Sequence, residues 1–296
     1  MKCLVTGGAG FIGSNLALEL EKQSHAVIVV DNLFTGTKDN LKGFKGKFIQ
    51  ADISKPFKIE EKFDMIFHEA AITDPRFEDD KETIRQNVDG FKNIIALAQK
   101  NNAKLIYASS ASLYGNGAVP MKESQKKQLL SAYARSKLMM DEIAETLFKK
   151  MHIVGLRYFN VFGPREQHKG RPASMIFHLA KQIKEKDKVR LFKFGEQKRD
   201  HIYVKDAVDA TIKAADAESG IYNVGTGIAT SFNEVVKTLN KVLGKNAPIE
   251  YFDNPYKEDT YQANTQADTE KAEKFLKFRA KYSFEDGVKD YMRFLR

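Results

Sequence analysis

The sequence predicts an α/β protein with a doubly wound parallel sheet and a smaller C-terminal lobe. Strand-like and helix-like segments alternate through the first half of the 296 residues, and the strand-like segment 26–30 is apolar at every position. A strand of that kind is covered on both faces, as in parallel sheets with helices on either side. A glycine cluster directly after the first strand-like segment is the third observation that supports this fold class.

The elements of the first half follow in order. Residues 26–30 form a continuous apolar run, and the segment before it places Ile12, Leu16 and Leu20 on one helical face. The β-α-β alternation implies a parallel sheet with helices on both faces. We expect strands at 2–6, 26–30, 47–51, 65–68, 105–108 and 152–158, and helices at 11–23, 83–100 and 132–149.

After Gly163 and Pro164 the alternation weakens, and from about Pro248 the sequence is polar and mixed. Ser231, with Glu234 three residues later, fits the N-cap pair of a helix. In this half we expect helices at 174–186, 205–215 and 233–243 and strands at 189–192 and 221–224.

Composition excludes several classes of protein. The net charge of +9 comes from basic residues that are mixed with acidic ones, without a basic tail or zinc-finger spacing, so we expect a solvated surface that suits an anionic small substrate rather than nucleic acid. The single cysteine, Cys3, excludes an intrachain disulfide and a multi-cysteine zinc site, and we expect no metal. No apolar run reaches the roughly 18 residues of a membrane span, and the N-terminus does not resemble a signal peptide. We therefore expect a cytoplasmic protein without a membrane partner.

Gly7, Gly10 and Gly13 form a G-x-x-G-x-x-G motif between the first strand and the first helix. In such a motif one glycine allows the tight turn, one lets a pyrophosphate approach the backbone, and one lets the helix pack on the strand. The phosphates then face the unpaired N–H groups at the helix N-terminus, here beside Phe11 and Ile12. With this context, the motif predicts a dinucleotide site of the Rossmann type.

Asp31 ends the second strand, 18 residues after Gly13, where an acid that binds the ribose is expected. Asp31 favours NAD, whereas Asn32 and Lys38 in the same loop suit the 2′-phosphate of NADP. Lys38 is equally explained as a solvated loop lysine, so the motif alone leaves NAD and NADP open.

Two further loops are placed to contact the dinucleotide. Asp52 and Ile53 follow the third strand, where the adenine is expected, and Glu69, Ala70 and Ala71 follow the fourth, where small residues let a cofactor lie close. We divide the chain into a dinucleotide-binding Rossmann domain, residues 1–165 with contributions from 200–230, and a mainly substrate-binding lobe, residues 166–296.

Ser110, Tyr133 and Lys137 form the candidate chemical site. Ser110 ends a strand, and the tyrosine and lysine lie four residues apart on one helix face. A lysine ammonium and a positive nicotinamide lower the pKa of a tyrosine, so that its phenolate can take a proton from a sugar hydroxyl. A Y-x-x-x-K pair alone is common, but with the glycine motif and the serine strand it predicts an oxidoreductase-type centre.

With these motifs, nearly the whole chain resembles the extended short-chain dehydrogenases/reductases, most of which modify nucleotide sugars. More particular segments resemble the ADP-L-glycero-D-manno-heptose 6-epimerase family, whose members invert C6 of an ADP-heptose for the lipopolysaccharide inner core. These segments are residues 31–38, 166–170, 173–179, 198–200 and 261–268, whereas residues 157–165 are shared widely in the superfamily.

The resemblance implies a carbohydrate epimerase, an isomerase, that oxidises and re-reduces the sugar with bound NADP. It implies Tyr133 and Lys169 as the two acid/bases, Lys137 at the nicotinamide ribose and Ser110 at the reacting oxygen. Without the resemblance, Lys169 would be taken for a surface lysine. The resemblance also places Asn32 and Lys38 near the 2′-phosphate, adds Asn87, Val161 and Lys169 to the cofactor contacts, and implies a homo-oligomer, with rings of five.

The resemblance also implies substrate contacts in the lobe. Asn160 would lie at the sugar, Arg199 at the diphosphate, and Tyr261 would close over the diphosphate. The guanidinium of Arg199 suits a diphosphate, but an ion pair with Asp200 or another acid is the alternative. The nucleotide end would be lined by His178, Phe192, Lys193, Phe194 and Gly195, although His178 is equally explained as an ordinary helix histidine.

Arg171 and Pro172 depart from the family pattern beside Lys169, which puts the accepted sugar in question and makes Arg171 a candidate substrate contact. The main alternative function is a UDP-hexose 4-epimerase, which needs only one base. A 4,6-dehydratase lacks support, because Ala111, Ser112 and Leu113 supply no acid for elimination. A non-catalytic NAD(P)-sensing regulator would not need the Tyr133 and Lys137 pair.

Overall fold

Seven strands form a sheet in the order β10-β6-β5-β4-β1-β2-β3, and every neighbouring pair is parallel. The computed structural model describes residues 1–74, 79–253 and 262–295. The predicted doubly wound parallel sheet is therefore confirmed. Its strands are β1 (Lys2–Thr6), β2 (Ala26–Asp31), β3 (Lys47–Gln50), β4 (Met65–His68), β5 (Lys104–Ser110), β6 (Ile153–Tyr158) and β10 (Gly220–Val224).

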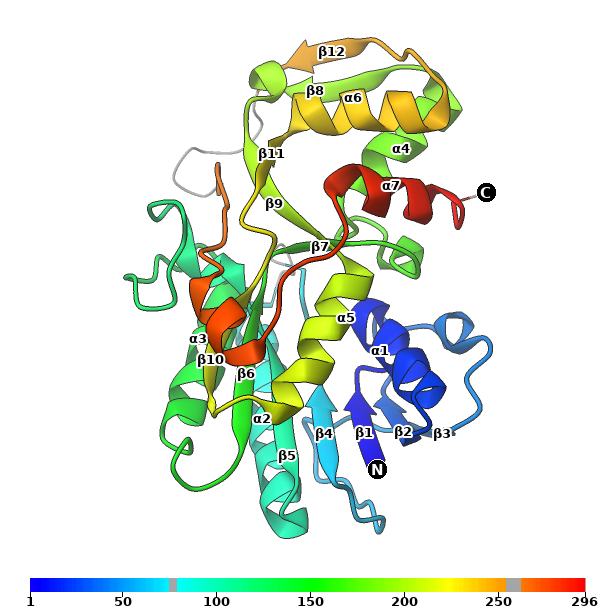
Figure 1. Cartoon of the computed structure of the whole chain (residues 1–296). Coiled ribbons are helices and arrows are strands. Elements are labelled where there is room, and N and C mark those ends of the chain that lie inside the picture. The colour runs from blue at the N-terminus through cyan, green and yellow to red at the C-terminus, as the bar shows by residue number, and fades with distance from the viewer. Residues whose placement is uncertain (75–78, 254–261, 296) are drawn as a thin grey trace.

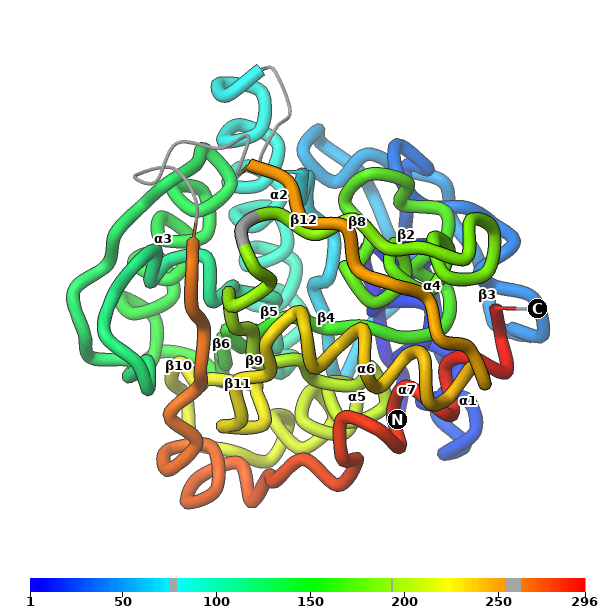
Figure 2. Tube along the Cα trace, turned by 90° about the horizontal axis from the view of Figure 1, so that it is seen from above, coloured from blue at the N-terminus to red at the C-terminus, as the bar shows by residue number. Residues whose placement is uncertain are grey.

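Helices cover both faces of this sheet (Figures 1 and 2). On one face α1 (Phe11–Lys22) packs with α5 (Val204–Lys213), and on the other α2 (Asp80–Asn101) packs with α3 (Ala132–Glu145). Alternate strand residues enter the two cores: Val5 of β1 joins the cluster of Leu16, whereas its neighbour Leu4 joins the cluster of Phe91. Burial on both faces explains why the inner strands are mainly apolar, whereas the edge strand β3 has exposed Lys47 and Gln50.

The lobe lies above the carboxyl ends of the sheet strands in the view of Figure 1. Strand β9 pairs with β7 in parallel and with β11 in antiparallel fashion, and β8 pairs with β12 in parallel. The strands are β7 (Asn160–Phe162), β8 (Val189–Phe192), β9 (Lys198–Tyr203), β11 (Ala229–Ser231) and β12 (Ile249–Phe252). The helices are α4 (Met175–Lys186), α6 (Phe232–Leu243) and α7 (Phe284–Met292).

Short helical turns complete the described chain: the 3₁₀ turns η1 (Lys38–Leu41), η2 (Ala111–Tyr114), η3 (Gln167–Lys169), η4 (Lys193–Gly195) and η5 (Ala214–Asp216), and the π-helical turn η7 (Ala272–Leu276). Ser231 caps α6 in a capping box with Glu234, as predicted. Helix α3 ends at Glu145 rather than at the predicted Lys149. The region after Pro248, expected to be polar and mixed, contains β12, η7 and α7.

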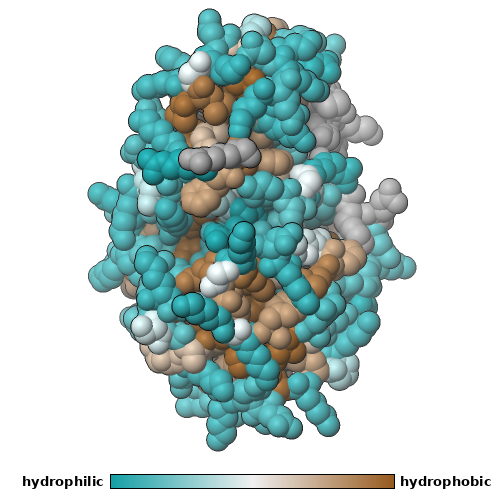
Figure 3. All heavy atoms as spheres, turned by 90° about the vertical axis from the view of Figure 1, so that its right-hand side faces the viewer, coloured by the Kyte–Doolittle hydropathy of each residue, from teal (hydrophilic) through white to brown (hydrophobic). Residues whose placement is uncertain are grey.

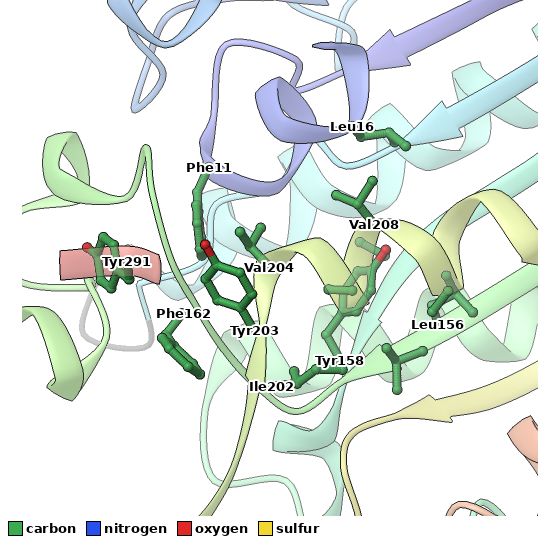
Figure 4. Close-up of a cluster of buried hydrophobic side chains, with 14 of the residues drawn as sticks. Phe11, Leu16, Leu156, Tyr158, Phe162, Ile202, Tyr203, Val204, Val208 and Tyr291 are labelled. Atoms are coloured by element: carbon green, nitrogen blue, oxygen red, sulfur yellow. The ribbon is translucent and has the colours of Figure 1, made fainter. Parts of the chain in front are cut away.

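One part of the core joins the sheet to the lobe (Figure 4). The ring of Phe162 in β7 lies 5.5 Å from that of Tyr203 in β9 and 6.4 Å from that of Tyr291 in α7. Phe11 of α1 and Val204 of α5 belong to the same buried cluster. The helix that follows the glycine loop is therefore packed against the base of the lobe.

The surface is mainly hydrophilic on the face shown in Figure 3, with apolar side chains gathered in limited areas. Leu41, Phe44 and Phe48 are partly buried residues that pack against the core. Among the described residues, none of the helices combines the length and the apolar character of a membrane span.

Candidate active site

A cavity of about 310 Å³ opens where the carboxyl ends of the sheet strands meet the base of the lobe. Ligands of open α/β sheets bind at this edge. The structure brings most of the predicted cofactor and catalytic residues into its lining: Gly7, Phe11, Ile12, Gly13, Asp31, Asn32, Asp52, Ile53, Glu69, Ala70, Ala71, Asn87, Ser110, Tyr133, Lys137, Val161 and Lys169.

The remaining predicted site residues that the structure describes are not in this lining. Gly10 is the N-cap of α1, and the Nζ atom of Lys38 lies 5.1 Å from the ring centroid of Phe48. Tyr261 lies outside the described residues, and the side chain of Lys193 is not described. The others belong to the lobe and its junction with the sheet: Asn160, Arg171, His178, Phe192, Phe194, Gly195 and Arg199.

Two glycines of the loop after β1 are required by close backbone contacts. Gly7 has a φ of +67°, and a Cβ atom there would lie 2.5 Å from the backbone nitrogen of Ala70. A Cβ atom on Gly13 would lie 2.3 Å from the carbonyl oxygen of Gly7. The loop, the first turn of α1 and the segment after β4 therefore meet as the motif predicts.

The N-terminus of α1 has no side-chain cap and no acidic residue in its first turn. Its first N–H groups therefore lie beside the cavity without a side-chain acceptor, in the arrangement that binds phosphate. Asp31 accepts from the Ala9 N–H at 3.0 Å and from the Leu33 N–H at 2.8 Å. Burial raises the pKa of Asp31, which these backbone donors partly offset.

Helix α3, which carries Tyr133 and Lys137, is held on the sheet by a buried ion pair. Asp141 of α3 accepts from Arg157 of β6 at 2.9 Å, and both side chains are almost inaccessible to solvent. Tyr107 of β5 also donates to Asp141 at 2.9 Å. A buried pair with these additional hydrogen bonds fixes the rotation of the helix, and so directs its other face to the cavity.

Lys137 is buried in the cavity wall, and Tyr133 is partly buried beside it. The Lys137 ammonium donates to the Ala108 carbonyl at 2.7 Å and lies 5.8 Å from the Tyr133 ring centroid. Burial lowers the pKa of Lys137 to about 8. Burial also raises the pKa of Tyr133 to about 12, although a hydrogen bond with Ser110 lowers it. We expected a lowered tyrosine pKa, and in the protein alone burial outweighs the neighbouring groups.

Glu69, directly after β4, is a further acid in the cavity wall. Its Oε1 atom lies 3.0 Å from the Tyr158 hydroxyl, and burial raises its pKa to about 7. Asn87 of α2 fixes the same segment: it accepts from the Ile72 N–H at 2.8 Å and donates to the Ser136 hydroxyl at 2.9 Å. The loop after β4 is thereby tied to α3.

Lys169 reaches the cavity from the lobe side. Its Nζ atom lies 5.6 Å from the Phe11 ring centroid, and burial lowers its pKa. The turn that carries Lys169 is anchored by the buried Glu166, which accepts from the Ser174 N–H at 2.6 Å and from the Gly163 N–H at 3.2 Å. Tyr133 and Lys169 therefore come from opposite parts of the chain to one cavity.

The predicted lobe residues have mainly structural partners in this structure. Asn160 donates to the Thr265 hydroxyl at 2.9 Å, and Arg199 donates to the carbonyls of Ala263 at 2.6 Å and of Gln262. Arg171 forms an ion pair with Asp74 at 3.1 Å. His178 Nε2 lies 3.2 Å from the Arg171 carbonyl, and Phe194 is exposed, with its ring 5.9 Å from that of Tyr251.

Several cavity residues were missed by the sequence analysis. His168 precedes Lys169, and its Nδ1 atom lies 3.0 Å from Asn40 Nδ2. Tyr158 ends β6, within the segment 157–165 that the sequence analysis singled out, so its place at a strand end was the available signal. The other missed residues flank predicted ones: Val30, Phe34, Thr35, Ala51, Ser54, Ile72, Thr73, Gln86, Ala108, Ser109 and Phe159.

The cavity fits a dinucleotide cofactor on the evidence of its own residues. The uncapped α1 N-terminus suits a pyrophosphate, and the cavity extends from the glycine loop to Tyr133. Ser109 Oγ and Glu69 Oε2 are buried polar atoms without a partner among the described residues, as expected where a polar ligand binds.

Comparisons with known proteins agree with this geometry. Residues 3–225 match the NAD dependent epimerase/dehydratase family. An ADP-L-glycero-D-manno-heptose-6-epimerase from Brachyspira hyodysenteriae is 38% identical, with 99% of this chain and 97% of the relative covered. The crystal structure of the Helicobacter pylori ADP-L-glycero-D-manno-heptose-6-epimerase has a TM-score of 0.93 at 38% identity, covering 99% of this chain and 95% of that one.

A UDP-glucose 4-epimerase from Thermotoga maritima, solved with UDP-glucose, has a TM-score of 0.90 at 28% identity, covering 100% of this chain and 99% of that one. The fold is thus shared between the two kinds of epimerase, and the higher identity lies with the heptose epimerases. The chain belongs to the NAD dependent epimerase/dehydratase family and, within it, to the ADP-L-glycero-D-manno-heptose-6-epimerase group.

Proposed function

We propose that this protein inverts C6 of the heptose in ADP-D-glycero-D-manno-heptose, giving the L-glycero epimer, and that Tyr133 and Lys169 are its two acid/bases. The observation that carries the two-base scheme is that both side chains line one cavity, Tyr133 from α3 and Lys169 from η3. A one-base 4-epimerase has no use for a lysine at that position. The substrate rests on the heptose epimerases that the chain resembles over nearly its full length.

A bound nicotinamide supplies reversible hydride exchange with the sugar carbon. Side chains of the protein transfer the proton of the C6 hydroxyl. When one epimer is oxidised, Tyr133 Oη takes the proton of its C6 hydroxyl, and Ser110 Oγ holds that oxygen. When the other epimer forms, Lys169 Nζ gives a proton to the C6 oxygen; in the reverse reaction the two roles exchange, and both groups recover their protonation states by exchange with solvent. The lowered pKa of Lys169 leaves more of it neutral, and so able to take a proton, than an exposed lysine. Lys137, fixed on the Ala108 carbonyl, binds the nicotinamide ribose.

We propose NADP, rather than NAD, as the resident cofactor. Both carboxylate oxygens of Asp31 accept from backbone N–H groups, which supports a structural role rather than recognition of a ribose 2′-hydroxyl. Asn32 lines the cavity beside it and would contact the 2′-phosphate. Lys38 lies just outside the lining, and we keep it as the cation at this phosphate. A Lys38→Ala variant should therefore retain less NADP and unchanged NAD.

The proposal extends to the lobe and to the assembly. We assign Asn160 to the sugar, Arg199 and Tyr261 to the diphosphate, and Arg171 to the substrate beside Lys169. We assign the nucleotide end of the substrate to His178, Phe192, Lys193, Phe194 and Gly195. The protein would act as a cytoplasmic homo-oligomer, a pentamer on the family resemblance, in lipopolysaccharide inner-core synthesis. Analytical ultracentrifugation tests the assembly.

Proton NMR of ADP-D-glycero-D-manno-heptose with the purified protein, without added cofactor, tests the function. Appearance of the L-glycero epimer supports both the substrate and a retained cofactor. No conversion, even with added NADP⁺, contradicts the heptose assignment, and UDP-hexose C4 epimerisation is then the assay to run.

A further inference from the structure

A chain of four polar groups leads from the cavity into the protein. Glu69 Oε1 lies 3.0 Å from Tyr158 Oη, which lies 2.6 Å from Thr211 Oγ1 of α5. Thr211 Oγ1 lies 2.7 Å from the carbonyl oxygen of Ala207. All three separations are hydrogen-bond distances, so each of the three contacts requires one proton.

The number of protons available to these contacts favours a neutral carboxyl group. A carbonyl has no proton to give, so Thr211 donates to Ala207. Each hydroxyl has one proton, so Tyr158 must then donate to Thr211. The proton between Tyr158 and Glu69 therefore has to come from Glu69. An ionised Glu69 would leave two protons for three contacts, whereas a neutral carboxylic acid satisfies all of them.

The second carboxyl oxygen supports the same state. Glu69 Oε2 is buried and has no hydrogen-bond partner among the described residues. A buried carboxylate oxygen without a donor is costly, and less so when the group is neutral. Burial raises the pKa of Glu69 to about 7, and the contact with Tyr158 and the charge of Lys137 only partly oppose this shift.

The ionisable groups around Glu69 come from three elements. Lys137 and Tyr133 approach from α3 and Tyr158 from β6, while His68 precedes Glu69 in β4. Burial lowers the pKa of His68 to about 3, so this ring is neutral. Lys137 is thus the cation in the field of Glu69, and an ionised Glu69 would raise the pKa values of both Lys137 and Tyr133.

We infer that Glu69 balances the charge of the oxidised nicotinamide: the carboxyl group is protonated while the cavity holds no ring charge, and it releases its proton to solvent when the positive ring enters. A second cation beside the buried Lys137 is unfavourable unless an anion forms nearby. Tyr158 can then turn its proton toward the new carboxylate. The step moves one proton and no electrons, and it rests on nicotinamide binding in this cavity, not on the heptose assignment.

The test compares the affinities for NADP⁺ and NADPH between about pH 5 and 7.5, a range in which Lys137 is mainly charged. The two cofactors share their phosphates and differ in the charge of the ring, so the ratio of their dissociation constants isolates the ring charge. The chain contains no tryptophan, so NADPH fluorescence reports binding without interference, and displacement by NADP⁺ gives the ratio. For the wild-type protein we expect the affinity for NADP⁺ relative to NADPH to rise about tenfold for each pH unit as the pH increases toward 7. Above pH 7 this ratio should level off.

Two variants distinguish the carboxyl group from its surroundings. In Glu69→Gln the ratio should not depend on pH, because the amide does not titrate but still donates to Tyr158. Thr211→Val is the matched control: it keeps Glu69 but frees the Tyr158 proton for the carboxylate. The pH at which the ratio levels off should fall by about one unit in that variant.

Circular dichroism melting checks that both variants fold. A wild-type ratio that does not change with pH would overturn the inference, as would a pH dependence that survives in Glu69→Gln. A lack of NADPH fluorescence enhancement at every pH would overturn it together with the cofactor site. NADPH binding without heptose conversion would contradict the proposed substrate and leave this inference standing.

Discussion

The sheet and the lobe hold their functional side chains by different means. In the sheet half, Tyr133 and Lys137 stand on a regular helix whose apolar contacts and one buried ion pair fix its orientation. In the lobe, loops are held by buried carboxylates. Glu166 anchors the turn of Lys169, and Asp200 accepts from the Thr226, Gly227 and Ala267 N–H groups. Hydrophobic periodicity therefore predicts the first arrangement and not the second.

The two acid/bases that we propose lie one in each half. Tyr133 is carried by the regular helix α3, whereas Lys169 is carried by the 3₁₀ turn η3. The departure from the family pattern at Arg171 and Pro172 lies on the lobe side, next to Lys169.

Removing the sheet-side acid/base should have the largest effect. We expect Tyr133→Phe to lower the epimerisation rate by roughly 10²–10⁴-fold, because the proton of the C6 hydroxyl then has no acceptor on that side. Melting temperature and cofactor retention should stay near wild type, since the phenyl ring keeps the packing. Tyr282→Phe is the matched control, because the Tyr282 ring packs on Tyr203 outside the cavity lining. An equal loss of rate in both variants would contradict the role of Tyr133.

The anchor of the lobe-side turn is the next test. Glu166→Ala leaves the Ser174 and Gly163 N–H groups without their acceptor, and we expect a loss of about 2–3 kcal/mol in unfolding free energy. Lys169 should lose its position at the same time, so the epimerisation rate should fall at temperatures where the variant is fully folded. Urea unfolding and the NMR assay measure the two effects. An unchanged rate in the folded variant would show that Lys169 does not depend on this anchor.

The pH dependence of the epimerisation rate should reflect the protonation of Lys137, on the sheet side of the cavity. The pKa of Lys137 is lowered to about 8 by burial, so this residue is charged below pH 8 and neutral above it. The charged form assists ionisation of Tyr133, and kcat/KM should therefore fall about tenfold per pH unit above pH 8. In Lys137→Arg this alkaline limb should move to higher pH, because arginine stays charged. An alkaline limb that stays at the same pH in Lys137→Arg would assign it to another group.

The smallest expected effect is on a lobe helix far from the chemistry. Ser231→Ala removes the capping box of α6 and should cost about 1 kcal/mol of unfolding free energy without changing the epimerisation rate. Ser174→Ala is the informative partner, since Ser174 caps α4 and also donates to Glu166 at 2.8 Å. We expect Ser174→Ala to lower both the unfolding free energy and the epimerisation rate. Equal epimerisation rates in Ser174→Ala and Ser231→Ala would contradict a link between Glu166 and the position of Lys169.

The sequence predicted the sheet well because its signal is local. Strands β1, β4 and β8 begin and end at the predicted residues. Strand β9 was missed because Arg199, Asp200 and His201 are polar residues that are buried there. Their burial depends on partners such as Thr226 and Ala267, which no local pattern reveals. Helix α7 carried a usable signal, with Ser283 as N-cap before an amphipathic segment, and was overlooked.

The same distinction holds for the candidate site. Ser110, Tyr133 and Lys137 were placed by motif and spacing, and the structure brings them into one cavity. Lys169 was named only through the family resemblance, because a polar loop gives no indication that a lysine turns inward. Glu69 was predicted for its small neighbours, and its contact with Tyr158 became visible only when β4 and β6 were placed together.

The central claim is that the two halves of the molecule supply one acid/base each, and single-turnover oxidation of each epimer tests it directly. Purified Tyr133→Phe and Lys169→Ala, loaded with NADP⁺, would each be mixed with the D-glycero and the L-glycero substrate, and the near-ultraviolet absorbance of NADPH followed. We predict opposite patterns: each variant oxidises one epimer and fails on the other, and the two variants fail on different epimers. If both variants fail on the same epimer, or Lys169→Ala oxidises both as fast as wild type, the two-base account is wrong.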